Sequence, residues 1–244
     1  MSNGHNGEMK KQESVAAIIQ ARMGSRRLPG KSLKVVYRDY SLLELVISRV
    51  KAAKRIDQVI LVTSINTDCD VLVEMANQAG ICVVRGSETD VLSRFVKAIH
   101  VCQPNDVVRI CGDNPLVSPE EIDKLVEYYR EFEFDYASNH TPDSGLPDGL
   151  GAEIVRAGLL VTIGDKVSQS HFREHVTSYI IENRQEFHTG QLEAEETLWC
   201  PQVRLDINTS KDLENVQRFM KTLPEADRPL WSSQVVVDHA KRLM

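Results

Sequence analysis

Residues 15–31 read VAAIIQARMGSRRLPGK, and this stretch gives the strongest indication of the fold. Val15–Gln20 is an almost continuous apolar run, which predicts a strand buried on both faces. Gly24 and Gly30 follow it, and glycines let a backbone bend and come close to a ligand. The same loop holds four basic residues: Arg22, Arg26, Arg27 and Lys31. In a chain of net charge -6, this concentration of cations predicts a specific polyphosphate site and argues against a diffuse nucleic-acid surface.

The length and composition are those of one globular domain. The chain has 244 residues and is 42% hydrophobic, enough for a large α/β core. Residues 1–14 are polar and lack apolar periodicity, so we expect a disordered tail and no signal peptide. No segment is long enough to span a membrane. Five cysteines without C-x-x-C spacing indicate reduced thiols in a cytoplasmic protein. We therefore expect a single domain over residues 15–244, with a small excursion over about 139–200.

Strands and helices alternate through the first half of the chain. Buried apolar runs predict strands at Val15–Gln20, Val59–Thr63, Ile81–Val84 and Val107–Cys111. Helical periodicity, N-cap residues and the Pro119 signal predict helices at Ser41–Lys54, Cys69–Ala79, Asp90–Val101 and from Ser118 to about Arg130. This pattern is typical of a doubly wound, mostly parallel sheet with helices on both faces.

The pattern changes after Tyr136. Asn139–Gly151 is rich in Asn, Pro, Asp and Gly, which predicts a long loop of the kind that usually carries function. Further strands are expected at Ala152–Val155 and Val203–Ile207, and an extended segment at Glu186–Leu192. Further helices are expected at Ser170–Asn183, Ser210–Met220 and Ser232–Leu243.

The loop after the first strand is suited to phosphate. Ligands of doubly wound sheets bind at the carboxyl ends of the strands, and this loop leaves such an end. Backbone N–H groups around Gly24 and Ser25 would cradle phosphate oxygens, while Arg22 and Lys31 would neutralise a triphosphate. The spacing matches neither the usual P-loop nor the dinucleotide fingerprint. A basic surface turn is the alternative.

Two aspartates are candidate metal ligands. Asp113 follows the strand Val107–Cys111 on a Gly-Pro turn, and Mg²⁺ prefers one or two carboxylates together with phosphate oxygens. Asp206 lies inside an apolar segment, where an unpaired charge is costly. The alternatives are a local turn for Asp113, and a pair with Arg204 or a helix cap for Asp206. A basic loop and two carboxylates favour nucleotidyl transfer, in which an oxygen attacks the α-phosphorus and pyrophosphate leaves.

Residues 19–31 (IQARMGSRRLPGK) resemble the signature of the CMP-sugar synthetase superfamily. Within it, the chain resembles the spore coat polysaccharide biosynthesis protein F-type cytidylyltransferases. Further matches follow in the family's order at residues 85–94 (RGSETDVLSR), 112–116 (GDNPL), 173–177 (REHVT) and 204–206 (RLD). The resemblance implies a nucleotide-diphospho-sugar transferase-like fold and transfer of a cytidylyl group from CTP to a sugar or sugar acid. It also implies Mg²⁺ as cofactor and a CMP-activated sugar for surface polysaccharide as product.

The resemblance also assigns roles to individual residues. Arg22 and Lys31 would bind the triphosphate, and Asp113 and Asp206 the magnesium; these four are the expected catalytic residues. The expected nucleotide-binding residues are Ala21, Arg22, Met23, Gly24, Ser25, Arg26, Lys31, Ser87, Asp90, Arg94 and Gly112. An N-cap role is an equal alternative for Asp90. The expected acceptor-binding residues are Asp148, Gly149, Glu153, Arg173, Glu174 and His175.

The acceptor side is the most open part of this interpretation. Many relatives have an acid where this chain has Gly151, so the identity of the acceptor is undecided. Arg173, Glu174 and His175 would bind the acceptor or lie at a subunit interface, since relatives commonly form homodimers through this segment. On a helix, His171 and His175 would share a face and fit a zinc pair, but no third ligand is evident.

Two other functions stay open. One keeps the fold but uses another NTP such as GTP, or a sugar-phosphate, polyol-phosphate or phosphonate acceptor. The other is a non-catalytic nucleotide-binding protein. Neither nucleic acid nor a membrane is an expected partner.

Overall fold

The structure is a computed structural model that describes residues 13–140, 142–226 and 228–244. The tail predicted over residues 1–14 therefore lies outside the described residues except for its last two. Of these, Ser14 is tied to the domain, because its backbone N–H donates to Asn105 Oδ1 at 3.0 Å.

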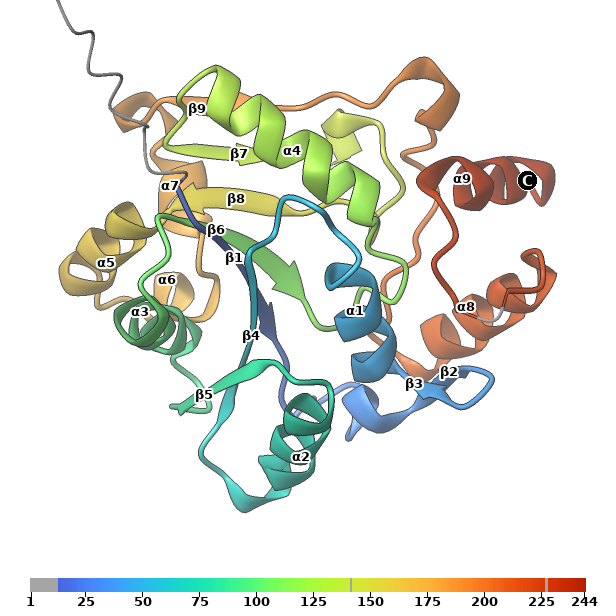
Figure 1. The fold of residues 1–244 in the computed structure, drawn as a ribbon, viewed down its shortest axis with the longest axis horizontal. Helices are drawn as coiled ribbons and strands as arrows, with labels where there is room; N and C mark the ends of the chain where they lie inside the picture. The colour runs from blue at the N-terminus through green and yellow to red at the C-terminus, as the bar shows by residue number, and fades with distance from the viewer. Residues whose placement is uncertain (1–12, 141, 227) are drawn as a thin grey trace, which may run out of the picture.

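The described residues form a seven-stranded sheet in the order β5-β4-β1-β6-β8-β7-β9 (Figure 1). The strands are β1 Val15–Gln20, β4 Gln58–Ser64, β5 Cys82–Gly86, β6 Asp106–Cys111, β7 Tyr136–Ser138, β8 Glu153–Arg156 and β9 Thr189–Gln191. β5, β4, β1 and β6 run parallel, whereas β8 is antiparallel to both β6 and β7. A small hairpin, β2 Val35–Tyr37 and β3 Tyr40–Ser41, lies outside this sheet. The predicted mostly parallel, doubly wound sheet is confirmed.

Helices cover both faces of the sheet. One face packs against α1 Leu42–Val50, α2 Asp70–Gln78, α4 Pro119–Glu131, α8 Ser210–Thr222 and α9 Ser233–Arg242. The other packs against α3 Val91–Cys102, α5 Ala157–Lys166, α6 Ser170–Glu174 and α7 Ser178–Glu182. In Figure 1, α3, α5 and α6 accordingly lie on the opposite side of the sheet from α1 and α2. Among the described residues, no helix has the length and apolar character needed to cross a bilayer.

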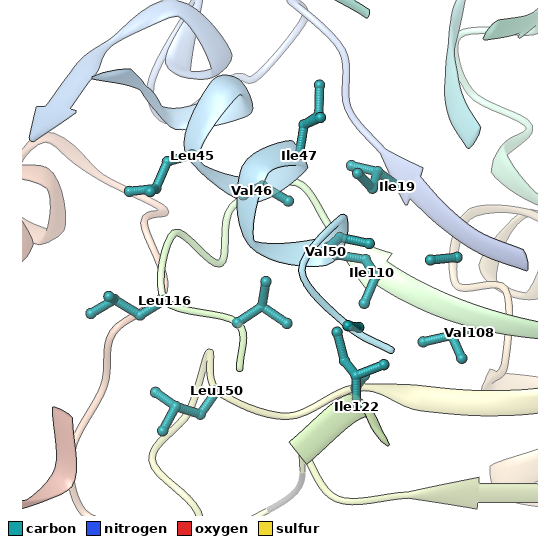
Figure 2. Close-up of a cluster of buried hydrophobic side chains, with 14 of the residues drawn as sticks. Ile19, Leu45, Val46, Ile47, Val50, Val108, Ile110, Leu116, Ile122 and Leu150 are labelled. Carbon is teal, nitrogen blue, oxygen red and sulfur yellow. The ribbon is translucent and has the colours of Figure 1, made fainter. Parts of the chain in front are cut away.

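Strand β1 is apolar because both of its faces are buried. Ala17 and Ile19 point into the core under α1, whereas Ala16 and Ile18 point into the core under α3. Figure 2 shows the first of these cores, where Ile19 lies with side chains of β6 and of α1. The central strand is thus held on both sides, which fixes the position of the loop that leaves it.

The helix starts follow the capping residues in the sequence. Ser41 and Glu44 form a capping box at α1, and Ser118 caps α4 with Pro119 at its first position. Asp90 caps α3 by accepting from the Ser93 N–H at 2.9 Å. The N-cap alternative for Asp90 is therefore what the structure shows.

Two predictions for the second half need correction, and two elements were missed. The helix predicted over Ser170–Asn183 is two short helices, because the chain is extended at His175 and Thr177 Oγ1 donates to Glu153 Oε1 at 2.6 Å. The core strand predicted at Val203–Ile207 is instead an extended segment with one isolated bridge, between Asp148 and Arg204. Strand β7 and helix α5 were not predicted at all.

Candidate active site

A cavity of about 500 Å³ opens at the carboxyl ends of β1, β5 and β6. Its lining includes eleven of the residues predicted to bind ligands: Ala21, Arg22, Gly24, Ser25, Arg26, Lys31, Arg94, Gly112, Asp113, Glu174 and His175. It also includes seven that the sequence did not single out as ligands: Gln20, Arg27, Ser32, Glu88, Thr89, Val91 and Asn208. The structure thus brings the basic loop and the Asp113 turn to one site.

The basic loop is folded back on itself. The N–H groups of Ser25 and Gly30 both donate to the Met23 carbonyl, at 2.9 and 3.2 Å. Gly30 has φ +66°, a left-handed conformation that favours glycine. Met23 does not line the cavity, because its side chain packs against the core. The Met23 side chain is therefore turned away from the cavity, and the nucleotide-binding role of this residue stays a prediction.

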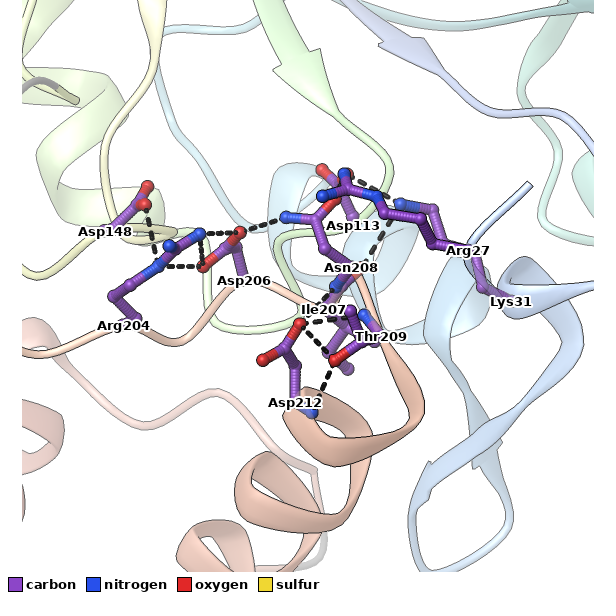
Figure 3. Close-up of polar contacts among 10 residues, drawn as sticks. All are labelled: Arg27, Lys31, Asp113, Asp148, Arg204, Asp206, Ile207, Asn208, Thr209 and Asp212. Atoms are coloured by element: carbon purple, nitrogen blue, oxygen red, sulfur yellow. Dashed lines mark hydrogen bonds and ion pairs between the residues drawn. The ribbon is translucent and has the colours of Figure 1, made fainter. Parts of the chain in front are cut away.

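Lys31 and Asp113 join the first strand's loop to the turn after β6. Lys31 Nζ lies 2.7 Å from Asp113 Oδ2 and donates to the Ile207 carbonyl at 3.1 Å (Figure 3). Gly112 lets the turn approach β1, because a Cβ at this position would lie 2.6 Å from the Gln20 carbonyl oxygen. Both charged groups are partly exposed to the cavity, so both can exchange partners with a ligand.

Asp206 lies behind the cavity wall. It is 8% exposed and pairs with Arg204, whose Nη2 is 2.9 Å from Asp206 Oδ2. The Asn208 amide also donates to Asp206, and Asn208 Oδ1 accepts from Arg27 Nη2 at 2.6 Å (Figure 3). The pair with Arg204, which the sequence left open as an alternative, is thus present.

The segment around Asp206 connects two loops. The Leu205 N–H donates to the Asp148 carbonyl at 2.8 Å, and the Ile207 N–H donates to the Asp113 carbonyl at 2.9 Å. Asp148 and Gly149 lie against this segment and do not line the cavity. Burial and the charge of Asp206 raise the pKa of Asp148 above its ordinary value. The predicted acceptor contacts of Asp148 and Gly149 are therefore not supported by the positions of these two residues.

Arg22 lies between two glutamates of the cavity wall. Its Nη1 donates to the Glu88 carbonyl at 2.8 Å and to Glu88 Oε1 at 3.2 Å. Its Nη2 lies 3.6 Å from Glu174 Oε1. Glu88 stands inside the motif at residues 85–94, which is the signal that could have pointed to it.

Asp90 and Arg173 hold each other and do not line the cavity. Arg173 Nη2 and Nε donate to Asp90 Oδ2 at 2.7 and 2.9 Å, and Arg173 Nη1 donates to the Gly164 carbonyl at 2.6 Å. Ser87 Oγ accepts from the Asp90 N–H at 3.1 Å and does not line the cavity either. These three residues shape the wall that holds Arg94, and their predicted ligand contacts are not supported by their positions.

Glu153 is the centre of a buried polar network. It is 2% exposed, forms an ion pair with Arg109, and accepts from Tyr136 Oη at 2.7 Å and Thr177 Oγ1 at 2.6 Å. Burial opposes its ionisation, but the charges of Arg109 and His140 hold the pKa of Glu153 well below its ordinary value. Its partners come from β6, β7 and the segment before α7, so Glu153 ties these elements together. It does not line the cavity, and its acceptor contact stays a prediction.

Gly151 cannot be exchanged for an acid on this backbone. A Cβ at this position would lie 2.3 Å from the Asn139 carbonyl oxygen and 2.6 Å from its carbonyl carbon. Backbone atoms cannot rotate away to relieve such a clash, as the end of a flexible side chain can. Glycine at position 151 therefore permits the close approach of residues 139 and 151.

The two histidines predicted to share a helix face lie side by side at the end of α6, with ring centroids 5.1 Å apart. His171 Nε2 lies 2.7 Å from Glu182 Oε1, whereas His175 follows α6 and lines the cavity. Across the described residues, no group of three or more His, Cys, Asp and Glu is placed to hold a metal ion. A magnesium site would therefore have to be completed by ligand oxygens.

Comparison with known proteins identifies the family to which the chain belongs. The chain matches the family model described as Cytidylyltransferase over residues 16–243. It is 38% identical over 200 residues to the spore coat polysaccharide biosynthesis protein SpsF of Bacillus subtilis, covering 80% of this chain and 81% of that protein.

Solved structures share the fold. A cytidylyltransferase from Leptospira borgpetersenii superposes with a TM-score of 0.86 at 26% identity, covering 95% of each chain. A CMP:2-keto-3-deoxy-manno-octonic acid synthetase complexed with CTP superposes with a TM-score of 0.65 at 16% identity, covering 86% of this chain and 99% of that one. At 16% identity, the similarity to this synthetase shows a shared fold and nothing more.

Proposed function

The chain belongs to the cytidylyltransferase family, and from this premise we propose that it transfers a cytidylyl group from CTP to a sugar or sugar acid, releasing pyrophosphate. The observation that carries the proposal is the Lys31–Asp113 pair beside the glycine loop, in one cavity. A cation and a carboxylate in contact at the carboxyl edge of a parallel sheet suit a metal-bound triphosphate. The names of the relatives, a spore coat polysaccharide protein and a sugar-acid synthetase bound to CTP, support the substrate class.

The loop cations bind and hold the triphosphate. Arg22 exchanges its contacts with Glu88 and Glu174 for phosphate oxygens, and Lys31 exchanges its contact with Asp113. Both then face the charge that grows on the departing pyrophosphate. Stabilisation of developing charge by fixed groups is the main requirement of phosphoryl-type transfer.

The carboxylates fit a hard divalent cation. Asp113 presents oxygen donors to the cavity, whereas Asp206 lies behind Asn208, paired with Arg204, and would have to exchange this partner to reach a bound ion. Asp113 and Asp206 would hold Mg²⁺, with phosphate oxygens and water completing its ligands. When bound, the ion would neutralise phosphate charge and fix the orientation of the phosphates.

In this proposal the acceptor lies beside Glu174 and His175. These two residues line the cavity and would bind the acceptor's hydroxyl groups. Arg173 pairs with Asp90 and does not line the cavity, so we give it no contact with the acceptor in this proposal. The product would be a CMP-activated sugar for surface polysaccharide, and we expect a cytoplasmic homodimer to make it.

Pyrophosphate release tests the proposal directly. Each of the four NTPs is assayed with a panel of sugar acids, sugars and sugar phosphates, with Mg²⁺ and with a chelator. We expect release with CTP, a sugar or sugar-acid acceptor and Mg²⁺, and loss of release on chelation. Turnover with GTP or a sugar phosphate would favour the alternative substrates, and nucleotide binding without any turnover would favour a non-catalytic protein.

A further inference from the structure

Two cysteines outside the cavity lie in contact with each other. Cys82 is the first residue of β5 and Cys102 is the last residue of α3, and their sulfur atoms are 3.6 Å apart. Both are free thiols and half-buried, whereas Cys69 and Cys200 are buried. The proposed reaction gives neither Cys82 nor Cys102 a role.

The packing of α3 on the sheet holds the two sulfurs together. Cys82 and Cys102 both lie against the hydrophobic core under α3, and Val84, two positions along β5, points into the same core. The helix ends at Cys102, because Gln103 follows it with φ +51°. The two cysteines are therefore neighbours in the folded chain although 20 positions separate them in the sequence.

A bond between these sulfurs needs only a small movement. The sulfurs of a disulfide are about 2 Å apart, so these two have to approach by roughly 1.5 Å. Rotation of the two side chains and a displacement at the end of α3 supply this movement, since helix ends are among the least stable parts of a fold. An oxidant reaches the pair from the amino ends of β4 and β5, where Cys82 lines a cavity of about 320 Å³.

The contact between the sulfurs decides how they react. Burial and the neighbouring Cys82 raise the pKa of Cys102 to about 11. Cys102 is therefore a protonated thiol at neutral pH, and a protonated thiol is a slow nucleophile. A partner sulfur at 3.6 Å offsets this slowness, because it replaces an encounter in solution by a reaction within one molecule.

We propose that Cys82 and Cys102 are a reversible oxidation site at which a peroxide forms a disulfide. The thiolate of one cysteine attacks hydrogen peroxide, the O–O bond breaks, and a sulfenic acid and water are formed. The other sulfur loses its proton and attacks the sulfenic sulfur, so that the S–S bond forms and a second water leaves. In total, two thiols lose two electrons and two protons, and hydrogen peroxide becomes two waters.

The disulfide closes a covalent ring that includes part of the wall of the proposed active site. The chain between the two cysteines contains four residues that line this larger cavity: Glu88, Thr89, Val91 and Arg94. The sulfurs lie at the other end of α3, about 18 Å along a helix of 12 residues. A ring restricts the unfolded chain more than the folded one, so oxidation stabilises this segment without covering the cavity.

Peptide mapping and thermal unfolding of the full chain test the site. The natural protein, Cys82→Ser, Cys102→Ser and the control Cys111→Ser are each treated with hydrogen peroxide under native conditions, and the remaining thiols are blocked with iodoacetamide. Cys111 is the matched control because it is the third half-buried cysteine. Digestion without reductant and mass spectrometry locate the bond. The Tm of each protein is measured before oxidation, after oxidation and after addition of dithiothreitol.

The natural protein and Cys111→Ser should both yield a peptide pair joined through Cys82 and Cys102. Their Tm should rise by about 5–10 °C on oxidation and return to its first value with dithiothreitol. Cys82→Ser and Cys102→Ser should yield no such peptide pair. Each of these two variants, compared with itself, should show no rise in Tm.

Three results overturn the proposal. If both cysteines stay free, or are converted only to sulfinic or sulfonic acids, the contact does not form a bond. If the joined peptides are found only in a covalent dimer on a non-reducing gel, the bond forms between two molecules and not at this contact. If the disulfide forms without a rise in Tm, the ring does not stabilise the segment.

Discussion

Lys31 Nζ lies 2.7 Å from Asp113 Oδ2, which joins the loop after β1 to the turn after β6 across 82 positions of the chain. Lys31 also donates to the Ile207 carbonyl at 3.1 Å. One ammonium group thus holds together the three segments that the sequence indicated as functional. The proposed chemistry depends on this contact being exchangeable.

Asp113→Asn should lower kcat by about 10²- to 10³-fold, because a fixed charge that acts on the transition state is removed at almost constant shape. Pyrophosphate release measures the rate. Asp68→Asn is the matched control, since Asp68 is an exposed carboxylate outside the cavity. Activity of Asp113→Asn close to that of the control would reject Asp113 as a metal ligand.

Glu153→Gln should lower the free energy of unfolding by about 3–5 kcal/mol, because it leaves the Arg109 charge buried without its partner. Urea unfolding measures the change. The double variant Arg109→Met with Glu153→Leu should recover part of the loss, since apolar side chains of similar volume often replace a buried ion pair at little cost. Equal stability of the single variant and the natural protein would contradict this account of the network.

His140 should stabilise the fold most at low pH. Burial opposes its protonation, but Glu153, whose Oε1 lies 3.4 Å from His140 Nε2, raises the pKa of His140 above 6.5. A raised folded-state pKa means that the stabilisation is complete below the unfolded pKa and is lost as the pH rises through the folded one. Urea unfolding of the natural protein and of His140→Asn is compared from about pH 5.5 to pH 8.5. The difference in free energy of unfolding between the two proteins should shrink as the pH rises. A difference that grows would contradict the assigned role of His140.

Gly151→Asp should lower the free energy of unfolding by about 1–3 kcal/mol or more, because its Cβ would meet the Asn139 backbone. The control is Gly158→Ala in α5, where a Cβ would meet nothing within 4 Å. The free energy of unfolding of Gly158→Ala should rise by about 0.5–1 kcal/mol, because alanine has the higher helix propensity. Thermal unfolding measures both, and a stable Gly151→Asp would show that residues 139 and 151 can separate.

The first half of the fold was predictable because burial on both faces leaves a continuous apolar run. Val15–Gln20 and Val107–Cys111 were predicted as strands to within one residue of β1 and β6. Cap residues such as Ser41 and Ser118 gave the helix starts. The family was predictable from the ordered motifs, and the match over residues 16–243 confirms it.

The second half was less predictable because apolar spacing reports burial and not hydrogen bonding. Val203–Ile207 has the alternation of a strand, but its N–H groups bond to the loops at Asp148 and Asp113 and to no neighbouring strand. Helix α5 was missed because Ala157–Lys166 holds two glycines and three β-branched residues, which lower helix propensity.

Within the site, single residues carried less information than the segments that hold them. The three functional segments were predicted, whereas the partners of Asp90, Glu153 and Arg173 were not. Asp90 and Arg173 are charged residues in matched motifs, and Glu153 was an expected acceptor-binding residue, yet each pairs with another protein group. Sequence cannot distinguish a charge that awaits a ligand from one that is already paired.

The Asp90–Arg173 pair has a mechanical consequence. It ties the start of α3 to α6, and Arg173 also donates to the Gly164 carbonyl of α5 at 2.6 Å. A single guanidinium beside the cavity thus joins three helices that cover the same face of the sheet.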